Sequence, residues 1–527
     1  PPPLPVADYP ADRTGGVLMQ VLDWHNQLEF PILAIMQLLP FAGLLMVRFI
    51  GNRAAALSAL AITTLELLLA IYLYRQFNQD VTALQFGEHL NLFGPLDYHA
   101  AVDGISVMFL LLTNFLILIV SLYGPIRGLT PQNRFQTTVL GIQACLVAMF
   151  VTLNLLWFVL ISFIQLILLG YLLWRWATSP NKDTAFTRYL QFMGSGLLLL
   201  ILGTLLLGWQ YAEAHNHVWS FDLVDLQGSP ILPVYQGWIF FLLFYGLAVR
   251  IPLFPLHGWL PLAVEHGTVA VAPILLLGLK TGIYGILRFV YPLLPEAVME
   301  WQTFLLVLAV AGILYAALLA MMQENLRRLL AYAVISHTGI VMIGLLSLHP
   351  LAFQGSTLLT INFGLAIAGL FFMTGLIFQH TGTTHLKQLG GLFDHMPVIA
   401  IAFLIASLAI VGMPGTPGFD AAHLLMEGSI EQFGTLVTIG AALGNVMAAG
   451  FLLWAFQRVF LSQAESTTLR IETSATLSTE ALIATVIIVA LLGLGFFTEP
   501  WLDLIDRSLA PLNDLYSTPA AHEYAKP

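Results

Sequence analysis

Stretches of about 20 apolar residues recur along almost the whole sequence, and they limit the possible folds more than any other feature. Each stretch is long enough to cross the hydrocarbon core of a bilayer as a helix. Hydrophobic residues make up 58% of the 527 residues and charged residues only 9%, a combination that a soluble domain of this length does not show. The sequence therefore predicts an all-α polytopic membrane protein.

The apolar stretches predict about fourteen membrane-spanning helices, joined mostly by short connections and without a separate soluble domain. The predicted spans are residues 30–49, 54–74, 103–124, 135–153, 155–176, 187–208, 235–256, 268–290, 301–322, 329–348, 357–379, 397–414, 433–457 and 480–497. We expect the residues between these spans, including the longer connection 75–102, to be linkers.

The distribution of basic residues predicts the orientation of the chain. Loops after odd-numbered spans hold Arg48, Arg53, Arg127, Arg134, Arg175, Lys182, Arg188, Arg327, Arg328, Lys387, Arg458 and Arg470. The termini and the loops after even-numbered spans hold Arg13, Arg75, Arg288, Arg507 and Lys526. Because basic residues are enriched in cytoplasmic loops, we expect both termini on the non-cytoplasmic side.

Composition and motifs exclude several classes of function. The net charge of −10 argues against a nucleic-acid partner. The single cysteine, Cys145, lies in an apolar run, which excludes disulfide frameworks and thiolate metal sites. No glycine-rich nucleotide fingerprint is present, so we expect no cofactor on this chain. Residues 1–29 lack a basic segment followed by an apolar one, so we expect no secretory signal there.

Two cations lie inside apolar segments on either side of a backbone break. Arg250 precedes the break at residues 251–255, and Lys280 lies near the centre of the next span. A basic group at mid-span costs about 2.5–3.5 kcal/mol, so it normally pairs or lines a cavity. Lysine can release a proton when it is desolvated, whereas arginine keeps its charge. We therefore predict a proton path with Lys280 as the relay and Arg250 as a fixed charge, the alternative being that Lys280 snorkels to the interface.

Histidines and a glutamate supply further candidate relay groups. Glu265 and His266 are adjacent, and with His257 they lie between the two cations, where they form either a relay or an ordinary polar loop. His337 is placed well inside its predicted span. We expect it to pass protons onward, although a lone histidine in an apolar helix is often only bonded to the backbone.

A second break at residues 413–418 is followed by a polar helix face. Asp420, His423 and Glu427 recur at helical spacing, which suits a proton exit, a solvated surface helix or, less well, a metal site. Breaks at matching positions of two halves are typical of inverted-repeat transporters, whereas prolines can also simply kink helices for packing. Asp103, at the start of a span, suits a helix cap as well as a site.

Several motifs resemble the antiporter-like, proton-translocating subunits of respiratory and photosynthetic complex I, of the chain 4 type. The motifs are AVDGIS (101–106), FPLHGWLP (254–261), LLLGLKTGIYGILRF (275–289), NLRRLLAYAVISHTG (325–339) and MPGTPGF (413–419). The resemblance implies two inverted five-helix repeats. The domains it implies are an N-terminal segment with three helices (1–134), the two repeats (135–290 and 301–457), and a last helix with a tail (458–527).

The resemblance also implies a place in a large complex. Electron transfer, the quinone and the iron–sulfur clusters would belong to other subunits, and the partners would be neighbouring antiporter-like membrane-arm subunits and lipids. The membrane would be a thylakoid or a bacterial inner membrane. This chain itself would bind no cofactor and no metal.

The sequence departs from the pattern of these subunits at charged positions. Lys280 and His337 match a lysine and a histidine of that pattern, while Arg250 stands where a lysine is usual. Other titratable positions of the pattern are replaced by Gln165 (glutamate), Leu262 (aspartate), Phe363 (histidine) and Ala422 (glutamate).

These departures leave several hypotheses open. Glu265 and His266 are the candidates to replace the missing acidic partner of the cations. Such divergence resembles the chain 4 variants of cyanobacterial CO2-uptake complexes, which would add a carbonic-anhydrase-like, CO2-hydrating partner. The alternatives are a cation (Na+)/proton antiporter subunit and a structural spacer that does not pump.

Overall fold

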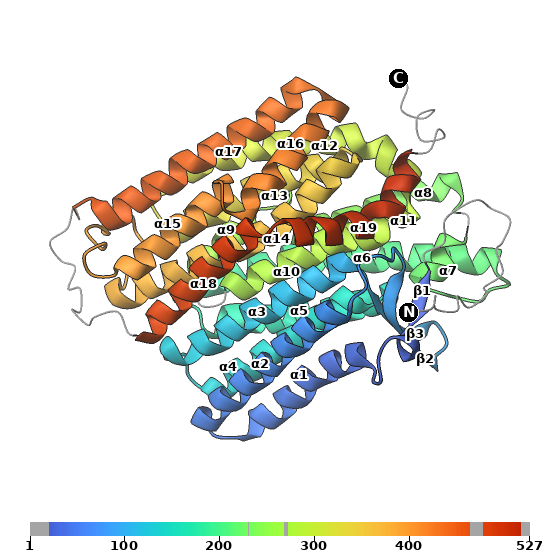
Figure 1. Ribbon diagram of the computed structural model, residues 1–527, viewed down its shortest axis with the longest axis horizontal. Coiled ribbons are helices and arrows are strands. Elements are labelled where there is room, and N and C mark those ends of the chain that lie inside the picture. The colour runs from blue at the N-terminus through green and yellow to red at the C-terminus, as the bar shows by residue number, and fades with distance from the viewer. Residues whose placement is uncertain (1–19, 230, 268–271, 464–477, 518–527) are drawn as a thin grey trace.

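The computed structural model describes residues 20–229, 231–267, 272–463 and 478–517, and they form a bundle of long helices with a small sheet at one end (Figure 1). Most of the segment in which we looked for a secretory signal lies outside the described residues. The first half contains β1 (Val21–Asp23), α1 (Ile32–Phe49), α2 (Asn52–Gln76), β2 (Leu84–Phe93), β3 (Leu96–Val102), α3 (Gly104–Ile126), α4 (Gln132–Val151), α5 (Leu155–Arg175), α6 (Lys182–Ala214), α7 (Leu223–Gln227), α8 (Pro233–Arg250), α9 (Leu260–His266) and α10 (Ala272–Gly285). The second half contains α11 (Tyr291–Leu293), α12 (Pro295–Met321), α13 (Leu326–Leu346), α14 (Pro350–Thr381), α15 (Pro397–Val411), α16 (Pro417–Phe433), α17 (Thr435–Phe456), α18 (Ser478–Phe496) and α19 (Glu499–Ser517).

The helical membrane fold is confirmed. Among the described residues, 11 helices are long and apolar enough to cross a membrane, namely α1 to α6, α12 to α14, α17 and α18. The other predicted spans correspond to α8, α10 and α15, of which α15 is a shorter apolar helix. The count of fourteen spans stays a prediction.

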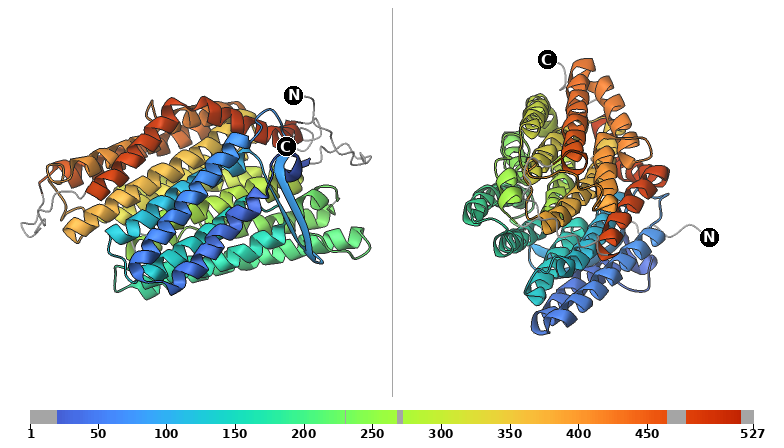
Figure 2. Two further views of the ribbon diagram at one scale, coloured as in Figure 1. Left: turned by 60° about the horizontal axis from the view of Figure 1, so that its bottom comes forward. Right: turned by 90° about the vertical axis from the view of Figure 1, so that its left-hand side faces the viewer.

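The helices differ greatly in how much of their surface the protein covers. The most apolar window of α13 is 100% buried and that of α14 is 94% buried, whereas α2 and α18 are each only 28% buried. α13 and α14 therefore form the centre of the bundle, and α1 and α2 lie at one edge of it (Figures 1 and 2). α18 and α19 cross the face formed by α14 (Figure 1).

A hairpin occupies the connection 75–102 that we expected to be a linker. β2 and β3 pair antiparallel, and β1 adds a parallel strand to β2. The buried Glu88 in β2 accepts hydrogen bonds from the backbone amides of Leu33 and Ala34, each at 2.8 Å, at the start of α1. The hairpin thus satisfies amides that the first turn of a helix leaves without partners.

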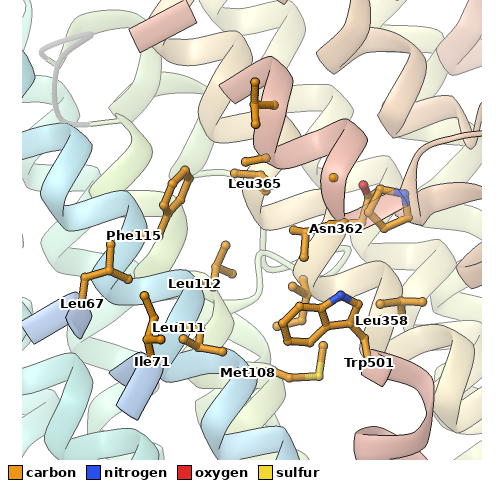
Figure 3. Close-up of a pocket in the computed structure, with 16 residues that line it drawn as sticks. Leu67, Ile71, Met108, Leu111, Leu112, Phe115, Leu358, Asn362, Leu365 and Trp501 are labelled. Carbon is orange, nitrogen blue, oxygen red and sulfur yellow. The ribbon is translucent and has the colours of Figure 1, made fainter. Parts of the chain in front are cut away.

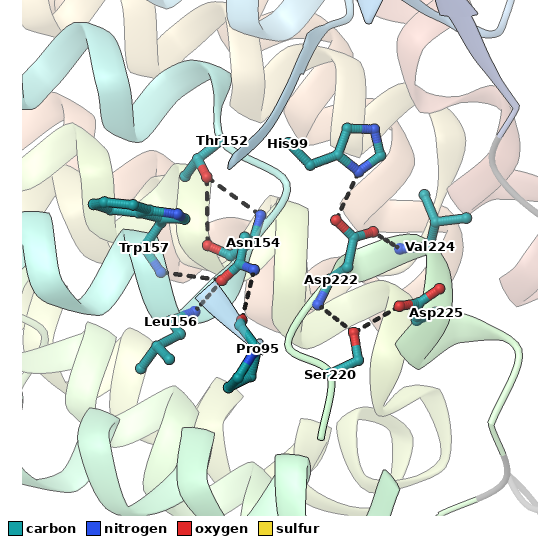
Figure 4. Close-up of polar contacts among 10 residues, drawn as sticks. All are labelled: Pro95, His99, Thr152, Asn154, Leu156, Trp157, Ser220, Asp222, Val224 and Asp225. Carbon is teal, nitrogen blue, oxygen red and sulfur yellow. Dashed lines mark hydrogen bonds and ion pairs between the residues drawn. The ribbon is translucent and has the colours of Figure 1, made fainter. Parts of the chain in front are cut away.

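Polar contacts join the hairpin to the helices that follow it (Figure 4). His99 of β3 pairs with Asp222 at 2.6 Å, and Asp222 also accepts from the amide of Val224 at the start of α7. Asn154 accepts from the amides of Leu156 and Trp157 and so caps α5. These contacts fix one end of the bundle.

The predicted breaks at residues 251–255 and 413–418 are both present. α8 ends at Arg250, and turns lead from it to α9, where the buried indole of Trp259 donates to the Val249 carbonyl at 3.0 Å. α15 ends at Val411, the next residue Gly412 has a φ of +83° that favours glycine, and α16 begins at Pro417.

Side-chain amides bind the carbonyls that the second break leaves open. Asn362 of α14 donates to the Ala409 carbonyl at 3.0 Å, and Asn445 of α17 donates to the Val411 carbonyl at 2.8 Å. The last carbonyls of a helix need such partners because no helical donor follows. The break is therefore a formed structural element between packed helices.

The C-terminal helix α19 ties several distant segments together. Its Ser508 hydroxyl accepts from the Gly104 amide at the start of α3 at 2.8 Å. Its Tyr516 hydroxyl donates to the Tyr291 carbonyl at 3.0 Å, and the Leu502 carbonyl accepts from Gln354 of α14 at 3.0 Å. α19 thus packs lengthwise against both halves of the bundle (Figure 1).

Candidate functional site

Lys280, Phe363 and His337 form a row across the centre of the bundle. Lys280 Nζ of α10 lies 5.0 Å from the ring centroid of Phe363 on α14. The Phe363 ring in turn stacks on the imidazole of His337 on α13, with 5.0 Å between centroids and 5° between planes. The aromatic ring thus separates the two groups that we expected to exchange protons.

Lys280 is buried in apolar surroundings, with 5% of its surface exposed. No ion pair or hydrogen bond joins it to another residue in the described part of the chain. The absence of a side chain at Gly364 makes room for it, because a Cβ there would lie 3.2 Å from Lys280 Cε. The amine therefore has a cation–π contact in place of a carboxylate partner.

His337 has a defined orientation. Its Nδ1 lies 3.2 Å from the Ala333 carbonyl, and a carbonyl can only accept, so Nδ1 carries a proton. Asn445 and the backbone of Ile410, beside the second break, also face the imidazole. Of the two alternatives, a relay or a backbone-bonded histidine, the backbone bond is present, and it leaves Nε2 as the acceptor of the neutral ring.

Arg250 is bound by uncharged acceptors. Its guanidinium donates to Gln165 Oε1 at 2.9 Å, to Thr281 Oγ1 at 3.1 Å and to the Ser162 carbonyl at 3.4 Å. Thr281 directly follows Lys280 in α10, so Arg250 is bonded to the helix that carries the relay candidate. A cavity of about 20 Å³ borders Arg250 and Gln165, a volume that suits one water molecule.

Glu265 and His266 lie in a different cluster from Arg250. The carboxylate of Glu265 is 3.5 Å from Arg328 and 3.9 Å from His266, and its carbonyl accepts from Arg327 at 3.1 Å. The His266 ring lies 3.1 Å from the Ser179 hydroxyl. In the described residues Glu265 and His266 therefore contact this arginine cluster and not Arg250, because α9 packs on α13. Their role as a replacement for the missing acidic partner stays a prediction.

His257 is held by aromatic contacts rather than by charges. Its ring lies 5.6 Å from Phe254 and 5.4 Å from Tyr315, and 8% of the residue is exposed. The first break is therefore lined by rings at this point.

Asp420, His423 and Glu427 all lie on α16, as the spacing predicts. The side chains of His423 and Glu427 are 74% and 49% exposed and 3.9 Å apart, while Asp420 accepts from Thr498. No group of three metal-ligating side chains occurs in the residues that the structure describes. Of the three alternatives, the arrangement agrees best with a solvated surface helix.

One buried ion pair was not predicted from the sequence. Arg288, which we counted among loop residues, lies in a π-helical turn (Ile286–Val290) and is 2.7 Å from Asp103, with 4% of its side chain exposed. It also donates to Ser106 at 3.0 Å and to Tyr284 at 3.1 Å. Asp103 meanwhile accepts from the Ser106 amide, so it is both a helix cap and an ion-pair partner.

A second missed pair lies near the end of α14. His380 is 3.0 Å from Glu480 of α18, whose side chain is fully buried. In the sequence, Glu480 is visible as an acidic residue at the start of an apolar span, but nothing near it indicates that its partner is His380, 100 residues earlier.

An apolar cavity of about 350 Å³ is bordered by Asn362 and Leu365 of α14, the helix that carries Phe363 (Figure 3). α2 and α3 supply one wall and α14, α18 and α19 the other, as Leu67, Phe115, Leu365 and Trp501 show. Apart from Asn362 and the Trp501 indole, the residues that line the cavity have apolar side chains. The cavity therefore suits an apolar, hydrocarbon-like occupant.

A polytopic bundle with two broken helices and isolated cations at its centre defines a transporter-like membrane protein. A family model described as "NADH:quinone oxidoreductase/Mrp antiporter, TM" matches residues 152–448. The NADH-ubiquinone oxidoreductase chain 4 of Marchantia polymorpha is 29% identical over 484 residues, which cover 90% of this chain and 95% of that protein. The NADH-quinone oxidoreductase subunit M of Escherichia coli K12 is 30% identical over 416 residues, which cover 77% and 81%.

Solved structures show the same architecture. A chain of respiratory complex I from Thermus thermophilus superposes with a TM-score of 0.81 at 25% identity, covering 94% of this chain and all of that one. A chain of the Mrp complex from Dietzia sp. DQ12-45-1b gives the same TM-score and coverage at 19% identity, which shows a shared fold. The chain belongs to the NADH:quinone oxidoreductase/Mrp antiporter family, as a complex I antiporter-like subunit.

Proposed function

We propose that this subunit translocates protons through the row of Lys280, Phe363 and His337 while other subunits of a quinone-reducing complex transfer the electrons. The observation that carries the proposal is the buried amine of Lys280, which has no carboxylate partner in the described residues and faces a histidine across one ring. A buried lysine without a counter-charge loses its proton more easily than an exposed one. Such an amine can take up and release a proton as the field around it changes.

The neighbouring groups have distinct roles in this scheme. Arg250 keeps its charge and, through its bond to Thr281, holds the helix that carries the lysine. His337 accepts the proton on Nε2 and passes it toward the second break. The Phe363 ring carries no exchangeable proton, so transfer requires the ring to move or water to enter.

The surface clusters supply the ends of the path. Glu265 and His266 connect with Arg328 near the start of α13, and Asp420, His423 and Glu427 lie on α16 beyond the second break. We assign Glu265 and His266 to proton entry or exit on one side of the membrane, and the residues of α16 to the opposite side.

The domain arrangement follows the two breaks. Residues 135–290 contain the broken segment α8 to α10, and residues 301–457 contain α15 and α16, which supports two repeats of like design. Residues 1–134 and 458–527 flank them. Arg48 and Arg175 lie at the ends of α1 and α5, and Arg127 and Lys387 follow α3 and α14. The positive-inside rule puts these ends in the cytoplasm and both termini on the opposite side.

Two finer versions of the function are testable. In one, the complex resides in a thylakoid, uses plastoquinone and drives CO2 uptake with a CO2-hydrating partner, and co-purification of that partner tests it. In the other, the subunit exchanges a cation such as Na+ for protons, which the shared fold with an Mrp chain supports. Sodium extrusion without electron transfer would distinguish this second version.

The central test is Lys280→Met in the assembled complex, reconstituted into proteoliposomes. We expect a loss of proton translocation per electron, with assembly preserved because methionine fills a similar volume without charge. Lys387→Met is the matched control, since Lys387 lies at the surface in an ion pair with Glu324. Wild-type translocation by Lys280→Met would contradict the assignment and favour the spacer function.

A further inference from the structure

Glu66 is a fully buried carboxyl in the middle of α2, and neither of its oxygens has a hydrogen-bond partner among the described residues. It interrupts a stripe of small residues on the buried face of this helix, between Thr63 and Ala70. The residues matched by the family model begin at 152, so this helix lies outside them. The row through Lys280 does not include it.

The protonated form of Glu66 is the one that this environment favours. An ionised carboxylate in hydrocarbon without a counter-charge is far more costly than the neutral acid. The basic residues of α1 to α4 lie at the helix ends and not in the apolar interior, and they are Arg48, Arg53, Arg75, Arg127 and Arg134. The other titratable groups on these helices are Tyr72, Tyr74, Tyr123 and Cys145, which are neutral at physiological pH.

The helices that pack against α2 carry a buried pair of uncharged polar side chains. α2 packs on α3 and α4, and these two are joined by a hydrogen bond of 2.7 Å from Gln143 to Asn114. That bond leaves Asn114 Nδ2 as a buried donor and Gln143 Oε1 as a buried acceptor, each without a partner. These polar groups are uncharged, so they supply no counter-charge for an ionised Glu66.

We propose that Glu66 is a second proton-binding site of this subunit, which holds one proton as a neutral acid within α1 to α4, apart from Lys280. The proposal rests on the proposed function only where it concerns translocation. The bound proton itself is a property of the carboxyl and can be tested separately. Glu66 binds it on an oxygen and releases it when a polar path to the helix ends opens.

The neutral acid has a diagnostic reactivity. A hydrophobic carbodiimide takes the acid proton on one nitrogen, the carboxylate oxygen adds to the central carbon, and migration of the acyl group leaves a stable N-acylurea. Reagent dissolved in lipid can reach α2, because Leu65 and Leu68 on either side of Glu66 are 46% and 56% exposed. Leu67 also lines the apolar cavity (Figure 3).

The first experiment treats the purified complex with dicyclohexylcarbodiimide and maps adducts by mass spectrometry. We expect an adduct on Glu66 in the wild type and in Glu66→Asp at the same position, no adduct there in Glu66→Gln, and no adduct with a water-soluble carbodiimide. An unmodified Glu66, or labelling only by the water-soluble reagent, would overturn the assignment. The labelling of the wild type by the two reagents decides the question without any variant and without translocation.

The second experiment measures protons moved per electron in the assembled complex. Glu66→Gln keeps shape and neutrality but cannot exchange a proton, so we expect assembly at the wild-type level with a reduced ratio that Glu66→Asp restores. Thr64→Val, on the exposed side of the same helix, is the control. A wild-type ratio in Glu66→Gln would overturn the proposal, because glutamine fulfils a purely structural role. If Lys280→Met also moves protons at the wild-type ratio, the proposed function is wrong. The carbodiimide labelling then tests on its own whether Glu66 binds a proton.

Discussion

The ring of Phe363 lies parallel to the imidazole of His337, at 5.0 Å and 5°, and it also faces the amine of Lys280. A residue without a dissociable proton thus stands between the two groups best suited to exchange one. The Phe363 ring also stabilises the protonated amine by a cation–π contact worth about 0.5–2 kcal/mol. In the proposed function, Phe363 therefore influences both the charge on Lys280 and the proton transfer to His337.

Phe363→His should introduce a titratable ring into this gap. Because an imidazole can accept and release protons near neutrality, we expect faster translocation and a new dependence on pH between about 5 and 8. Translocation is measured in proteoliposomes over that range. Phe363→Leu, which removes the ring and adds no proton carrier, is the control, and identical pH profiles for both variants would contradict the prediction.

Gln165→Glu should lock Arg250 in an ion pair. A carboxylate accepts from the guanidinium more strongly than an amide does, and arginine does not release its proton to open the pair. We expect fewer protons moved per electron. Gln165→Glu combined with Arg250→Lys should recover translocation, since a lysine–glutamate pair can open by proton exchange. A double variant that is as impaired as Gln165→Glu would rule this mechanism out.

Asp103→Ala should destabilise the subunit by about 3–5 kcal/mol, because it leaves the buried charge of Arg288 uncompensated. The free energy of unfolding is followed by thermal or denaturant titration of the complex. Asp103→Ala with Arg288→Met removes both charges, and we expect most of the stability to return. Equal loss in the single and the double variants would show that the cost comes from packing alone.

Gly418→Ala should disturb the second break. A Cβ at Gly418 would collide with the Ala409 carbonyl and lie 2.8 Å from Asn362 Nδ2, so we expect a loss of about 1–3 kcal/mol. Gly450→Ala is the matched control, since nothing lies within 4 Å of a Cβ there. We expect that control to be neutral or to gain about 0.5–1 kcal/mol in the helix interior. Equal melting temperatures for both variants would disprove the close approach.

The sequence allowed the spans and both breaks to be predicted because each has a local signal. Apolar length marks the helices, and the prolines at 252, 255, 414 and 417 mark the interruptions. Lys280 and Arg250 were recognised because a cation in an apolar run is conspicuous by itself. Such features depend only on residues that are close together in the sequence.

Partners distant in sequence could not be predicted. Arg288 looked like a loop residue because its position near the end of a span does not reveal Asp103 on α3. Glu265 looked like a partner of the buried cations, but the turns after α8 carry it to Arg328. The hairpin 84–102 lacks a long apolar run and so has no signal that distinguishes it from a linker. These features depend on tertiary packing.

The contacts of α19 form a mechanical linkage from the C-terminal end to the centre of the bundle. Ser508 holds the first amide of α3, and the residue just before it, Asp103, holds Arg288 on the turn that continues α10. α10 carries Lys280. A pull on α19 by a neighbouring subunit would therefore act as a lever on the helix of the buried amine, without any charge having to travel that distance.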